Sequence, residues 1–412
     1  MKPILKVTSK IYYDIMWYVL CLNWFGLMNV IDLFAGVGGL SLGAARAGFK
    51  VKAAVELDPF AISTHALNFP ASKHFMTDVS KINGKKFLES LSINSLDGLI
   101  GGPPCQGFSS MGKGMANDVR NDLYKHFYRL IKEMQPRFFL AENVPGILSK
   151  KYNHILNEAF SVIEGDYFIL PAIKVKASDF GAPTTRTRIF FIGYHKSLGE
   201  DFIAENDFQS KFPISPVTVK EALFGLPEFI DSEWLLDEQG WQEINKGVTG
   251  PFYNKLWGEI PPNVGDTFSI NMLSKSIVSG CLGTRHSEEV VNRYSLLTHG
   301  MVDKVSRSQK LDPDGFCPTL RAGTANDKGS YQAVRPIHPN QNRVITPREA
   351  ARLQGFPDWF RFHTTKWHSF RQIGNSVSPI VAEHILKRLH IRLIEQDAQL
   401  EGLNHDPLEI RI

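Results

Sequence analysis

The sequence predicts an α/β protein built on a doubly wound, mostly parallel β-sheet, with a smaller irregular domain. Between residues 29 and 195, short apolar segments of β-strand composition alternate with segments of helical periodicity. This alternation is typical of a parallel sheet with helices on both faces. The chain has 412 residues, more than one typical domain, so we expect a second domain or a long insertion.

The first predicted elements surround a glycine-rich loop. "NVIDLF" predicts a strand, "AGVGG" a turn, and "LSLGAARAGF" a helix that ends at Gly48. A second strand, "VKAAVEL", follows at once. "KHFMTDV" predicts a third strand that ends near Asp78, and "LDGLIGG" predicts a fourth.

The alternation continues through a helix "DLYKHFYRLIKEM", a strand "RFFLAENV", a helix "YNHILNEAFSVI" and a strand "RIFFIGY". After Tyr194 the periodicity ends until about residue 315, as in an irregular domain. It returns in "TPREAARLQGF", a helix with Thr346 as N-cap and Pro347 as its first residue. The loop "QIGNS" and a last helix, "SPIVAEHILKRLHIRLIEQ", follow.

The composition is that of a weakly basic globular protein. The formal net charge is +4, which tolerates a polyanionic partner without requiring one. Asp14 and Asn23 interrupt the apolar N-terminal stretch, so we expect neither a signal peptide nor a membrane span. The cysteines lack CxxC spacing, so we expect no metal site, no disulfide scaffold and a cytoplasmic location. They are Cys21, Cys105, Cys281 and Cys317.

The glycine-rich loop predicts a cofactor that contains a nucleoside. Its glycines allow close backbone approach, and Glu56, twenty residues beyond Gly36, is placed to bind ribose hydroxyls. The third glycine of G-x-G-x-x-G is replaced by Ser41, which disfavours a pyrophosphate. Asp78 could accept a hydrogen bond from an adenine amino group, which indicates S-adenosylmethionine. An ordinary glycine turn and a surface acid are the alternatives.

Three motifs place reactive side chains at strand ends. "GGPPCQGFSS" holds Cys105 on a rigid turn, beside the cofactor loop if the first and fourth strands are neighbours. Cys105 would be a nucleophile or, alternatively, a buried structural thiol. Glu142 in "AENVPG" would be a protonated donor to a base nitrogen, or a loop cap. Arg186 and Arg188 share one strand face and suit an oxygen and a phosphate, or else are solvated.

Seven motifs in order resemble those of the cytosine carbon-5 DNA methyltransferases of bacterial restriction-modification systems. They are "DLFAGVGGLSLGAARAGF", "ELDPFA", "GGPPCQGFSS", "AENVPG", "TRTRIFFIG", "REAARLQGFP" and "QIGNSVSP". The resemblance covers about residues 29 to 195 and 315 to 390. It implies a Rossmann-like, S-adenosylmethionine-dependent enzyme that methylates duplex DNA, with a target-recognition domain in the irregular middle.

The resemblance also implies a division of the chain. Residues 1–28 are an N-terminal extension, either an accessory helix or translation from an upstream start. Residues 29–195 form the first part of the catalytic and cofactor-binding domain. Residues 196–315 form the target-recognition domain, and residues 316–412 return to the catalytic domain with the C-terminal helix.

The resemblance assigns roles to individual residues. Cys105 would be the nucleophile, Glu142 the partner of ring nitrogen-3, Arg188 the partner of the cytosine oxygen, and Arg186 a support for a phosphate and the Cys105 loop. Thr184 stands where the family usually has Gln, which leaves the bracing of this loop open. The implied cofactor-binding residues are Phe34, Ala35, Gly36, Gly38, Gly39, Leu40, Glu56, Leu57, Asp78, Val79, Pro104, Leu123, Asn375, Ser376 and Val377.

This assignment agrees with the chemistry of cytosine. Carbon-5 is a poor nucleophile until a thiolate adds at carbon-6, and carbon-6 is accessible only when the base is flipped out of the duplex. The segment "SSMGKGMANDVRND" after Cys105 would be a mobile lid, or a disordered surface loop. Base or phosphate contacts could come from Arg285, His286, Arg293 and Lys304.

We expect a monomer without membrane contact and, as a partner system, a cognate restriction endonuclease. The sequence leaves three alternatives to a DNA methyltransferase. A transfer RNA cytosine-5 methyltransferase shares the motifs but needs a smaller middle region. A catalytically silent DNA-binding regulator would not need Cys105, Glu142 and both arginines. A nicotinamide-dependent dehydrogenase lacks its third glycine and a hydride-transfer constellation.

Overall fold

The structure of the chain is a computed structural model. It describes residues 27–104, 121–209, 214–230, 239–258, 260–322 and 335–402, with side chains from residue 123 onward in the second range. The N-terminal extension up to residue 26, and Cys105 with the segment that follows it, lie outside the described residues. Within the described ranges, no helix combines the length and the apolar character needed to cross a membrane.

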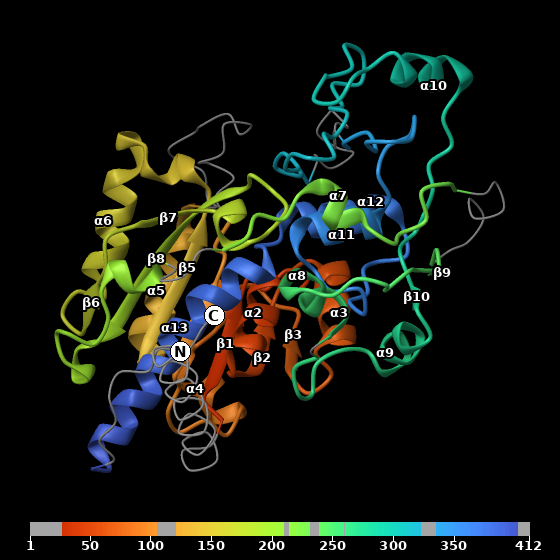
Figure 1. The fold of residues 1–412 in the computed structure, drawn as a ribbon. Helices are drawn as coiled ribbons and strands as arrows, with labels where there is room; N and C mark the ends of the chain where they lie inside the picture. The colour runs from red at the N-terminus through yellow and green to blue at the C-terminus, as the bar shows by residue number, and fades with distance from the viewer. Residues whose placement is uncertain are drawn as a thin grey trace, which may run out of the picture.

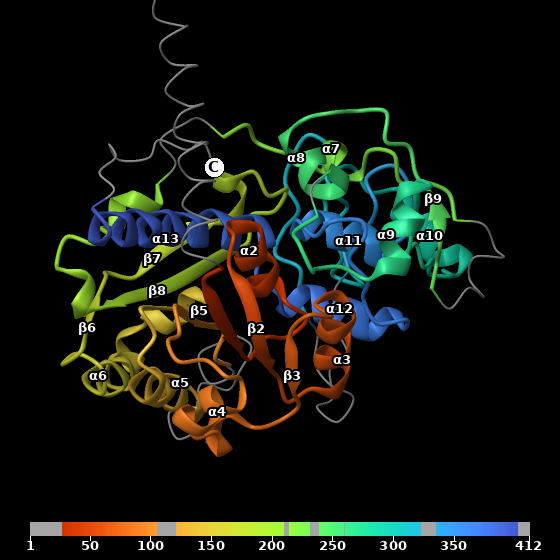
Figure 2. The same cartoon turned by 90° about the horizontal axis from the view of Figure 1, so that it is seen from below.

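An eight-stranded mixed sheet forms the centre of the fold (Figures 1 and 2). Its order is β3-β2-β1-β4-β5-β8-β6, and β7 also pairs with β8. Strands β1 to β5 are parallel, while β8 runs antiparallel to β5, and β6 and β7 run antiparallel to β8. The strands are β1 (Asn29–Leu33), β2 (Lys50–Val55), β3 (Lys73–Phe75), β4 (Gly98–Gly101), β5 (Phe138–Asn143), β6 (Tyr167–Ile169), β7 (Ile173–Lys176) and β8 (Thr187–His195).

Helices cover both faces of this sheet, as the alternating pattern predicts. Figure 2 shows α2 and α13 on one face and α4, α5 and α6 on the other. Each face has its own buried apolar cluster, one built around α2 and α13 and one around α5 and α6. These helices are α2 (Gly39–Ala47), α4 (Gly84–Ser90), α5 (Asn121–Met134), α6 (Asn153–Ser161) and α13 (Pro379–Leu400), and α3 (Pro59–Asn68) lies beside β3.

The strand neighbours are those that the site prediction requires. β1 pairs with β4, and β4 pairs with β5, so the glycine-rich loop and the segments after β4 and β5 meet at one edge of the sheet. α2 begins after Gly38, with φ of 99°, and ends at Gly48, with φ of 106°. Both glycines adopt the left-handed conformation that other residues avoid.

Two predicted boundaries are wrong. The third strand ends at Phe75 rather than near Asp78, because Asp78 is the N-cap of a 3-10 helix, Val79–Lys81. Its carboxylate accepts a hydrogen bond from the Ser80 amide at 2.8 Å. The segment "QIGNS" is not a separate loop, because "QIGN" forms the end of helix α12 (Lys366–Asn375).

The middle region consists of short elements, as its weak periodicity predicts, and its ribbon lies beside the sheet on the right of Figure 1. It has a two-stranded antiparallel sheet, β9 paired with β10, and helix α7 packs against α11. The elements of the middle region are α7 (Val219–Leu223), β9 (Gln242–Glu243), α8 (Pro251–Tyr253), the π-helix η8 (Asn254–Gly258), α9 (Thr267–Ser274), β10 (Ile277–Val278) and α10 (Glu288–Ser295), and α11 (Pro347–Gln354) follows it in the chain.

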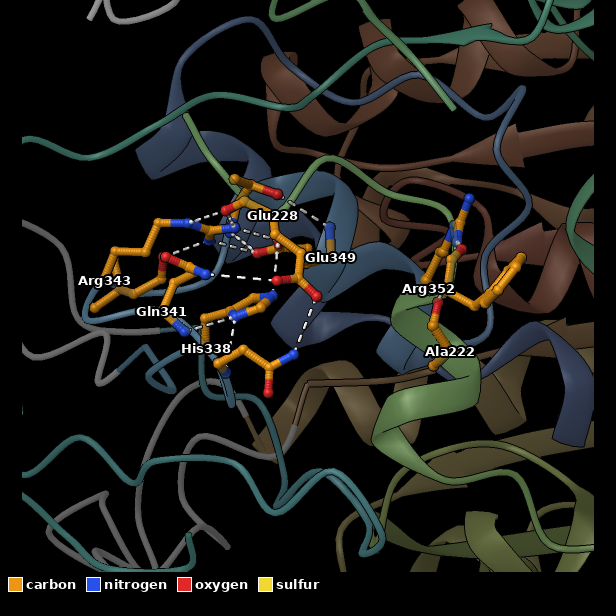
Figure 3. Close-up of polar contacts among 11 residues, drawn as sticks. Ala222, Glu228, His338, Gln341, Arg343, Glu349 and Arg352 are labelled. Atoms are coloured by element: carbon orange, nitrogen blue, oxygen red, sulfur yellow. Dashed lines mark hydrogen bonds and ion pairs between the residues drawn. The ribbon is translucent and has the colours of Figure 1, made fainter. Parts of the chain in front are cut away.

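Buried arginines on α11 attach the middle region to the rest of the chain. Arg352 is 0% exposed and forms two hydrogen bonds with Asp358, at 2.9 and 2.8 Å. It also donates to the carbonyl oxygens of Ala222 and Phe224, at 3.3 and 2.6 Å (Figure 3). Helix α11 therefore fixes the α7 segment through charged hydrogen bonds as well as apolar contacts.

A second polar cluster lies at the other end of α11 (Figure 3). Arg343 donates to both carboxylate oxygens of Glu349, at 2.9 and 2.7 Å, and to the backbone oxygen of Glu228, at 3.2 and 2.9 Å. Burial alone would raise the pKa of Glu349. The hydrogen bonds and charge of Arg343, together with His338, outweigh burial, so the pKa of Glu349 is lowered. Glu349 also caps α11 by accepting from the Thr346 amide at 2.7 Å, as the predicted N-cap requires.

Candidate active site

A cavity of about 360 Å³ lies at the carboxyl ends of the parallel strands, where a doubly wound sheet binds ligands. This volume is within the usual range for small-molecule sites. Four parts of the chain line it: the glycine-rich loop, the segment after β2, the ends of β4 and β5 with the start of β8, and the end of α12. The predicted residues on its wall are Phe34, Ala35, Gly36, Gly39, Leu40, Glu56, Pro104, Glu142, Arg186, Arg188, Asn375, Ser376 and Val377.

The glycine-rich loop and the segment after α12 are in close contact. A Cβ atom on Gly39 would lie 2.4 Å from the carbonyl oxygen of Val377, which is too close for any side chain. Gly36 has φ of 56°, and an added Cβ atom there would meet nothing within 4 Å. One glycine therefore permits close packing of two backbones, and the other permits a turn that leaves space for a ligand.

Glu56 connects this loop to the segment after β2. Its Oε2 accepts a hydrogen bond from the Gly36 amide at 3.0 Å, and its Oε1 accepts from the amides of Leu57 and Asp58 at 2.7 and 2.8 Å. Burial raises the pKa of Glu56, and these three amides partly offset that shift. The carboxylate is thus held beside the cavity with its position fixed, as a ribose-binding acid should be.

The donor set fits S-adenosylmethionine. The cavity combines close backbone approach at the glycine-rich loop, a fixed carboxylate for ribose hydroxyls and apolar walls from residues such as Phe34 and Val377. It does not present the glycine cradle of a dinucleotide pyrophosphate, because Ser41 replaces the third glycine and its side chain is fully buried. If S-adenosylmethionine binds here, Phe34 and Val377 would supply hydrophobic contacts and Glu56 would bind the ribose hydroxyls.

We expect the Gly39→Ala substitution to weaken S-adenosylmethionine binding by about tenfold or more, because overpacking of this kind typically costs about 1–3 kcal/mol. The added methyl group must displace either the start of α2 or the Val377 backbone. Equilibrium binding measures the effect. Gly165→Ala is the matched control, because an added Cβ atom there meets nothing within 4 Å. Equal affinity of both variants would contradict the described loop contact.

The other end of the cavity holds the predicted catalytic side chains. Glu142 is on β5 and Arg188 on β8, which are antiparallel neighbours. Arg188 Nε lies 2.6 Å from Glu142 Oε1, a close ion pair whose atoms are not aligned as a hydrogen bond. The guanidinium also donates to the Thr187 carbonyl at 2.8 Å. The side chains of Glu142 and Arg188 are 11% and 15% exposed, and both line the cavity.

The loop before β8 is braced without the usual Gln. The Thr184 hydroxyl accepts from the Arg186 amide at 3.3 Å. The main bracing comes from a backbone bridge to Cys317, in which the Thr185 amide donates to the Cys317 carbonyl at 2.9 Å and the Cys317 amide to the Pro183 carbonyl at 3.0 Å. Arg186, which is 2% exposed, donates to the Leu320 carbonyl at 3.3 Å. Cys317 and Leu320, which lie far along the chain, thus brace the loop before β8.

Some predicted cofactor residues do not line the described cavity. Gly38 is the N-cap of α2, and a Cβ atom there would lie 2.4 Å from the Phe69 ring. Val79 is buried in the 3-10 helix that Asp78 caps, Leu57 is 60% exposed, and Leu123 packs against the apolar cluster around α5. The roles of these residues stay predictions, as does that of Cys105, which lies outside the described residues.

The cavity also has a rim that the sequence did not predict. Arg371 on α12 lies 3.4 Å from the Asp58 carboxylate at the start of α3, and the Phe60 and His368 rings lie 4.0 Å apart. All four residues line the cavity. The signal for Asp58 was present in "DPF", since Asp followed by Pro is a helix N-cap pattern, but no local pattern links residues 58 and 371.

The four candidate DNA-contacting residues divide into two pairs. Arg293 donates to both oxygens of Asp303, at 3.0 and 3.2 Å, and His286 Nε2 accepts from the Val344 amide at 3.2 Å. Both are therefore engaged within the protein. Arg285 and Lys304 are exposed, so these two remain the candidates for contact with DNA.

Comparisons with known proteins agree with this fold and site. The family model of the C-5 cytosine-specific DNA methylases matches residues 28–390. A solved structure from E. coli, provisionally described as a DNA modification methyltransferase encoded within a prophage, is 61% identical and covers 89% of this chain and 99% of its own, with a TM-score of 0.81.

Two curated relatives are also similar. The type II methyltransferase M.XorII of Xanthomonas oryzae is 39% identical and covers 86% of this chain and 82% of its own. The type II methyltransferase M.DdeI of Desulfomicrobium norvegicum is 33% identical and covers 88% of each. The chain therefore belongs to the C-5 cytosine-specific DNA methylase family, and the expected class, a DNA (cytosine-5-)-methyltransferase, is confirmed.

Proposed function

We propose that this enzyme transfers a methyl group from S-adenosylmethionine to carbon-5 of a cytosine flipped out of a specific duplex DNA sequence, through a covalent Cys105 adduct. One observation carries the proposal: a single cavity joins the glycine-rich loop to Glu142, Arg186 and Arg188. A cofactor held by Phe34, Glu56 and Val377 and a base held by Glu142 and Arg188 would thus share one space. S-adenosylmethionine would supply an electrophilic methyl group there.

The proposed reaction begins at the turn after β4. The Cys105 thiolate adds to carbon-6 of the cytosine, and the ring gains electron density that makes carbon-5 nucleophilic. Glu142 donates a proton to nitrogen-3, and Arg188 donates a hydrogen bond to the exocyclic oxygen on carbon-2, so both stabilise the charge that develops on addition. Once carbon-5 carries the methyl group, a base removes the carbon-5 proton, the Cys105 sulfur leaves carbon-6, and nitrogen-3 returns its proton to Glu142 as the aromatic ring is restored. Pro103 and Pro104 immediately precede Cys105 in the sequence, and the Pro103 carbonyl accepts a hydrogen bond from the Asn143 side chain at 3.3 Å. This contact ties the segment between β4 and Cys105 to the strand of Glu142.

The ion pair between Glu142 and Arg188 suggests how the base engages the site. Arg188 Nε lies 2.6 Å from Glu142 Oε1, and both side chains line the cavity. A cytosine held between them would accept a hydrogen bond from Arg188 at its oxygen and face Glu142 with nitrogen-3.

We expect Glu142→Gln to reduce kcat by about 10²–10³-fold, the usual loss for one transition-state donor. The amide keeps the size of the side chain but cannot transfer a proton to nitrogen-3. S-adenosylmethionine affinity should change less than threefold, because Glu56 rather than Glu142 holds the cofactor. Steady-state methyl transfer to duplex DNA at saturating substrates measures kcat, and Glu158→Gln, at an exposed acid on α6, is the control. Unchanged kcat in Glu142→Gln would contradict this role.

Duplex DNA is the proposed substrate, and the exposed Arg285 and Lys304 of the middle region are proposed to contact it. A partner restriction endonuclease is proposed on the names of the type II relatives. Methylation-sensitive sequencing of DNA from cells that express the enzyme tests the substrate and finds the recognition sequence. Labelling of transfer RNA without labelling of DNA would overturn the substrate assignment.

A further inference from the structure

A buried carboxyl lies beneath the cofactor loop. Asp32 is on β1, two residues before Phe34, and it is 0% exposed. Its Oδ2 accepts a hydrogen bond from the Ser41 hydroxyl at 2.7 Å, and among the described residues no hydrogen-bond partner reaches its Oδ1. A buried carboxylate with half of its acceptor capacity unused is costly, so this group needs either a proton or a nearby positive charge.

A chain of hydrogen bonds connects this carboxyl to the edge of the sheet. His65 Nε2 lies 3.0 Å from Ser41 Oγ, and His65 Nδ1 lies 2.9 Å from His74 Nε2. Ser41 and His65 are fully buried, whereas His74 on β3 is half-buried. The chain therefore runs from the centre of the fold, under the glycine-rich loop, to a side chain that water can reach.

The four groups can be connected in two consistent directions. With Asp32 protonated, its hydroxyl donates to Ser41, Ser41 donates to His65 Nε2, and His65 Nδ1 donates to His74 Nε2. With Asp32 ionised, all three donors reverse, and one proton has left from His74 Nδ1. Both rings stay neutral in both arrangements, in agreement with the burial that lowers the pKa of His65 and of His74. The chain can thus transfer one proton between Asp32 and solvent without burying a charged histidine.

The other titratable group near Asp32 is Glu56. The two carboxyls repel each other, and burial together with this repulsion raises the pKa of Asp32 to about 7. The strand residues paired with Asp32, Ala54 on β2 and Ile100 on β4, do not titrate. Asp32 is therefore close to its titration midpoint at neutral pH. Because Asp32 interacts electrostatically with Glu56, which lines the cavity, a positive charge in that cavity would favour the ionised form of Asp32.

We propose that Asp32, connected to solvent through Ser41, His65 and His74, senses the charge of the cofactor and releases a proton when the sulfonium form binds. This inference rests on the proposed cofactor. S-adenosylmethionine carries a positive sulfonium, whereas the product of the reaction, S-adenosylhomocysteine, carries a neutral thioether of nearly the same shape. Asp32 would stabilise the substrate form and not the product form, which would favour product release.

Calorimetry on the wild-type enzyme tests this directly. Binding of S-adenosylmethionine, measured in two buffers of different ionisation enthalpy, should release roughly half a proton at pH 7, and binding of S-adenosylhomocysteine close to none. Asp32 loses its charge below pH 7, so the preference for the sulfonium form should fall as pH falls. Between pH 8 and pH 6 the ratio of the two dissociation constants should change by about tenfold. This ratio cancels pH effects that the two ligands share.

Variants locate the effect. Asp32→Asn should make the ratio independent of pH, and Ser41→Ala should move its midpoint to higher pH, because the Ser41 hydroxyl stabilises the ionised form. Asp97→Asn, at the opposite end of the sheet, where Asp97 accepts from the Asn29 amide at 2.7 Å, should keep the wild-type behaviour. Equal proton release with both ligands in the wild-type enzyme would overturn the inference. Failure of both ligands to bind would overturn the proposed function itself.

Discussion

Cys105→Ser is expected to abolish methyl transfer to duplex DNA, with a loss of more than about 10³-fold in kcat. Serine keeps the shape of the side chain, but its hydroxyl is a far weaker nucleophile than a thiolate toward carbon-6 of cytosine. S-adenosylmethionine affinity should stay within about threefold, because the proposed cofactor contacts are made by Glu56 and the glycine-rich loop and not by Cys105. Transfer of a labelled methyl group, together with equilibrium binding of the cofactor, separates chemistry from binding.

Cys281→Ala is the matched control for this experiment. Cys281 is 2% exposed, and burial raises the pKa of its thiol to about 12, so it stays protonated at neutral pH. It does not line the cavity of the active site. We expect the control variant to methylate DNA at nearly the wild-type rate. Comparable turnover of Cys105→Ser and wild-type enzyme would rule out the covalent route.

Arg352→Ala is expected to lower the free energy of unfolding by about 3 kcal/mol, as breaking a buried ion pair typically does. The substitution removes both hydrogen bonds that Arg352 donates to the buried Asp358 carboxylate. It also removes the hydrogen bonds that Arg352 donates to the carbonyls of Ala222 and Phe224. The loss should be near the low end of the usual range, because Arg348 Nη1 still lies 3.9 Å from Asp358. Equilibrium unfolding in urea measures the effect as a lower free energy of unfolding and a lower midpoint concentration of urea.

An exposed ion pair provides the comparison. Lys125 and Glu158 lie 2.7 Å apart, but their side chains are 41% and 57% exposed, so Lys125→Ala should cost less than about 1 kcal/mol. Equal stability losses in Arg352→Ala and Lys125→Ala would show that α11 does not anchor the middle region through its arginine. A separate unfolding transition of the middle region in Arg352→Ala would support that anchoring directly.

The periodic part of the fold was predictable from sequence, and the irregular part was not. Strands β1, β2, β4 and β5 were found from apolar runs bounded by glycine or polar residues, and Gly48 correctly ended α2. The short strands β6 and β7, with three and four residues, carry too little periodicity to be recognised. The segment predicted as a loop, Gln372–Ser376, instead contains the end of α12, although Gly374 and Asn375 are poor helix formers, because tertiary packing overrides that propensity.

The sequence predicts those parts of the candidate site in which the spacing between two residues along the chain determines that they meet. Glu56 follows Gly36 at the spacing of a ribose-binding acid, and the structure joins them by a hydrogen bond. Arg371 and Asp58, which meet across the rim of the cavity, are separated by most of the chain, so no local pattern relates them. Ser41 stands where a dinucleotide-binding loop has its third glycine, so in the sequence it only disfavours a pyrophosphate. In the structure, the Ser41 hydroxyl contacts Asp32 and His65.

The most direct test of the mechanism is capture of the covalent enzyme on DNA. Duplex DNA that carries 5-fluorocytosine at the methylated position, incubated with enzyme and S-adenosylmethionine, should give a complex that survives denaturation, because fluorine cannot leave as a proton does. Peptide mass spectrometry should place the nucleotide on Cys105. Active methyl transfer to normal DNA, with no adduct or with an adduct on any other residue, would contradict the account.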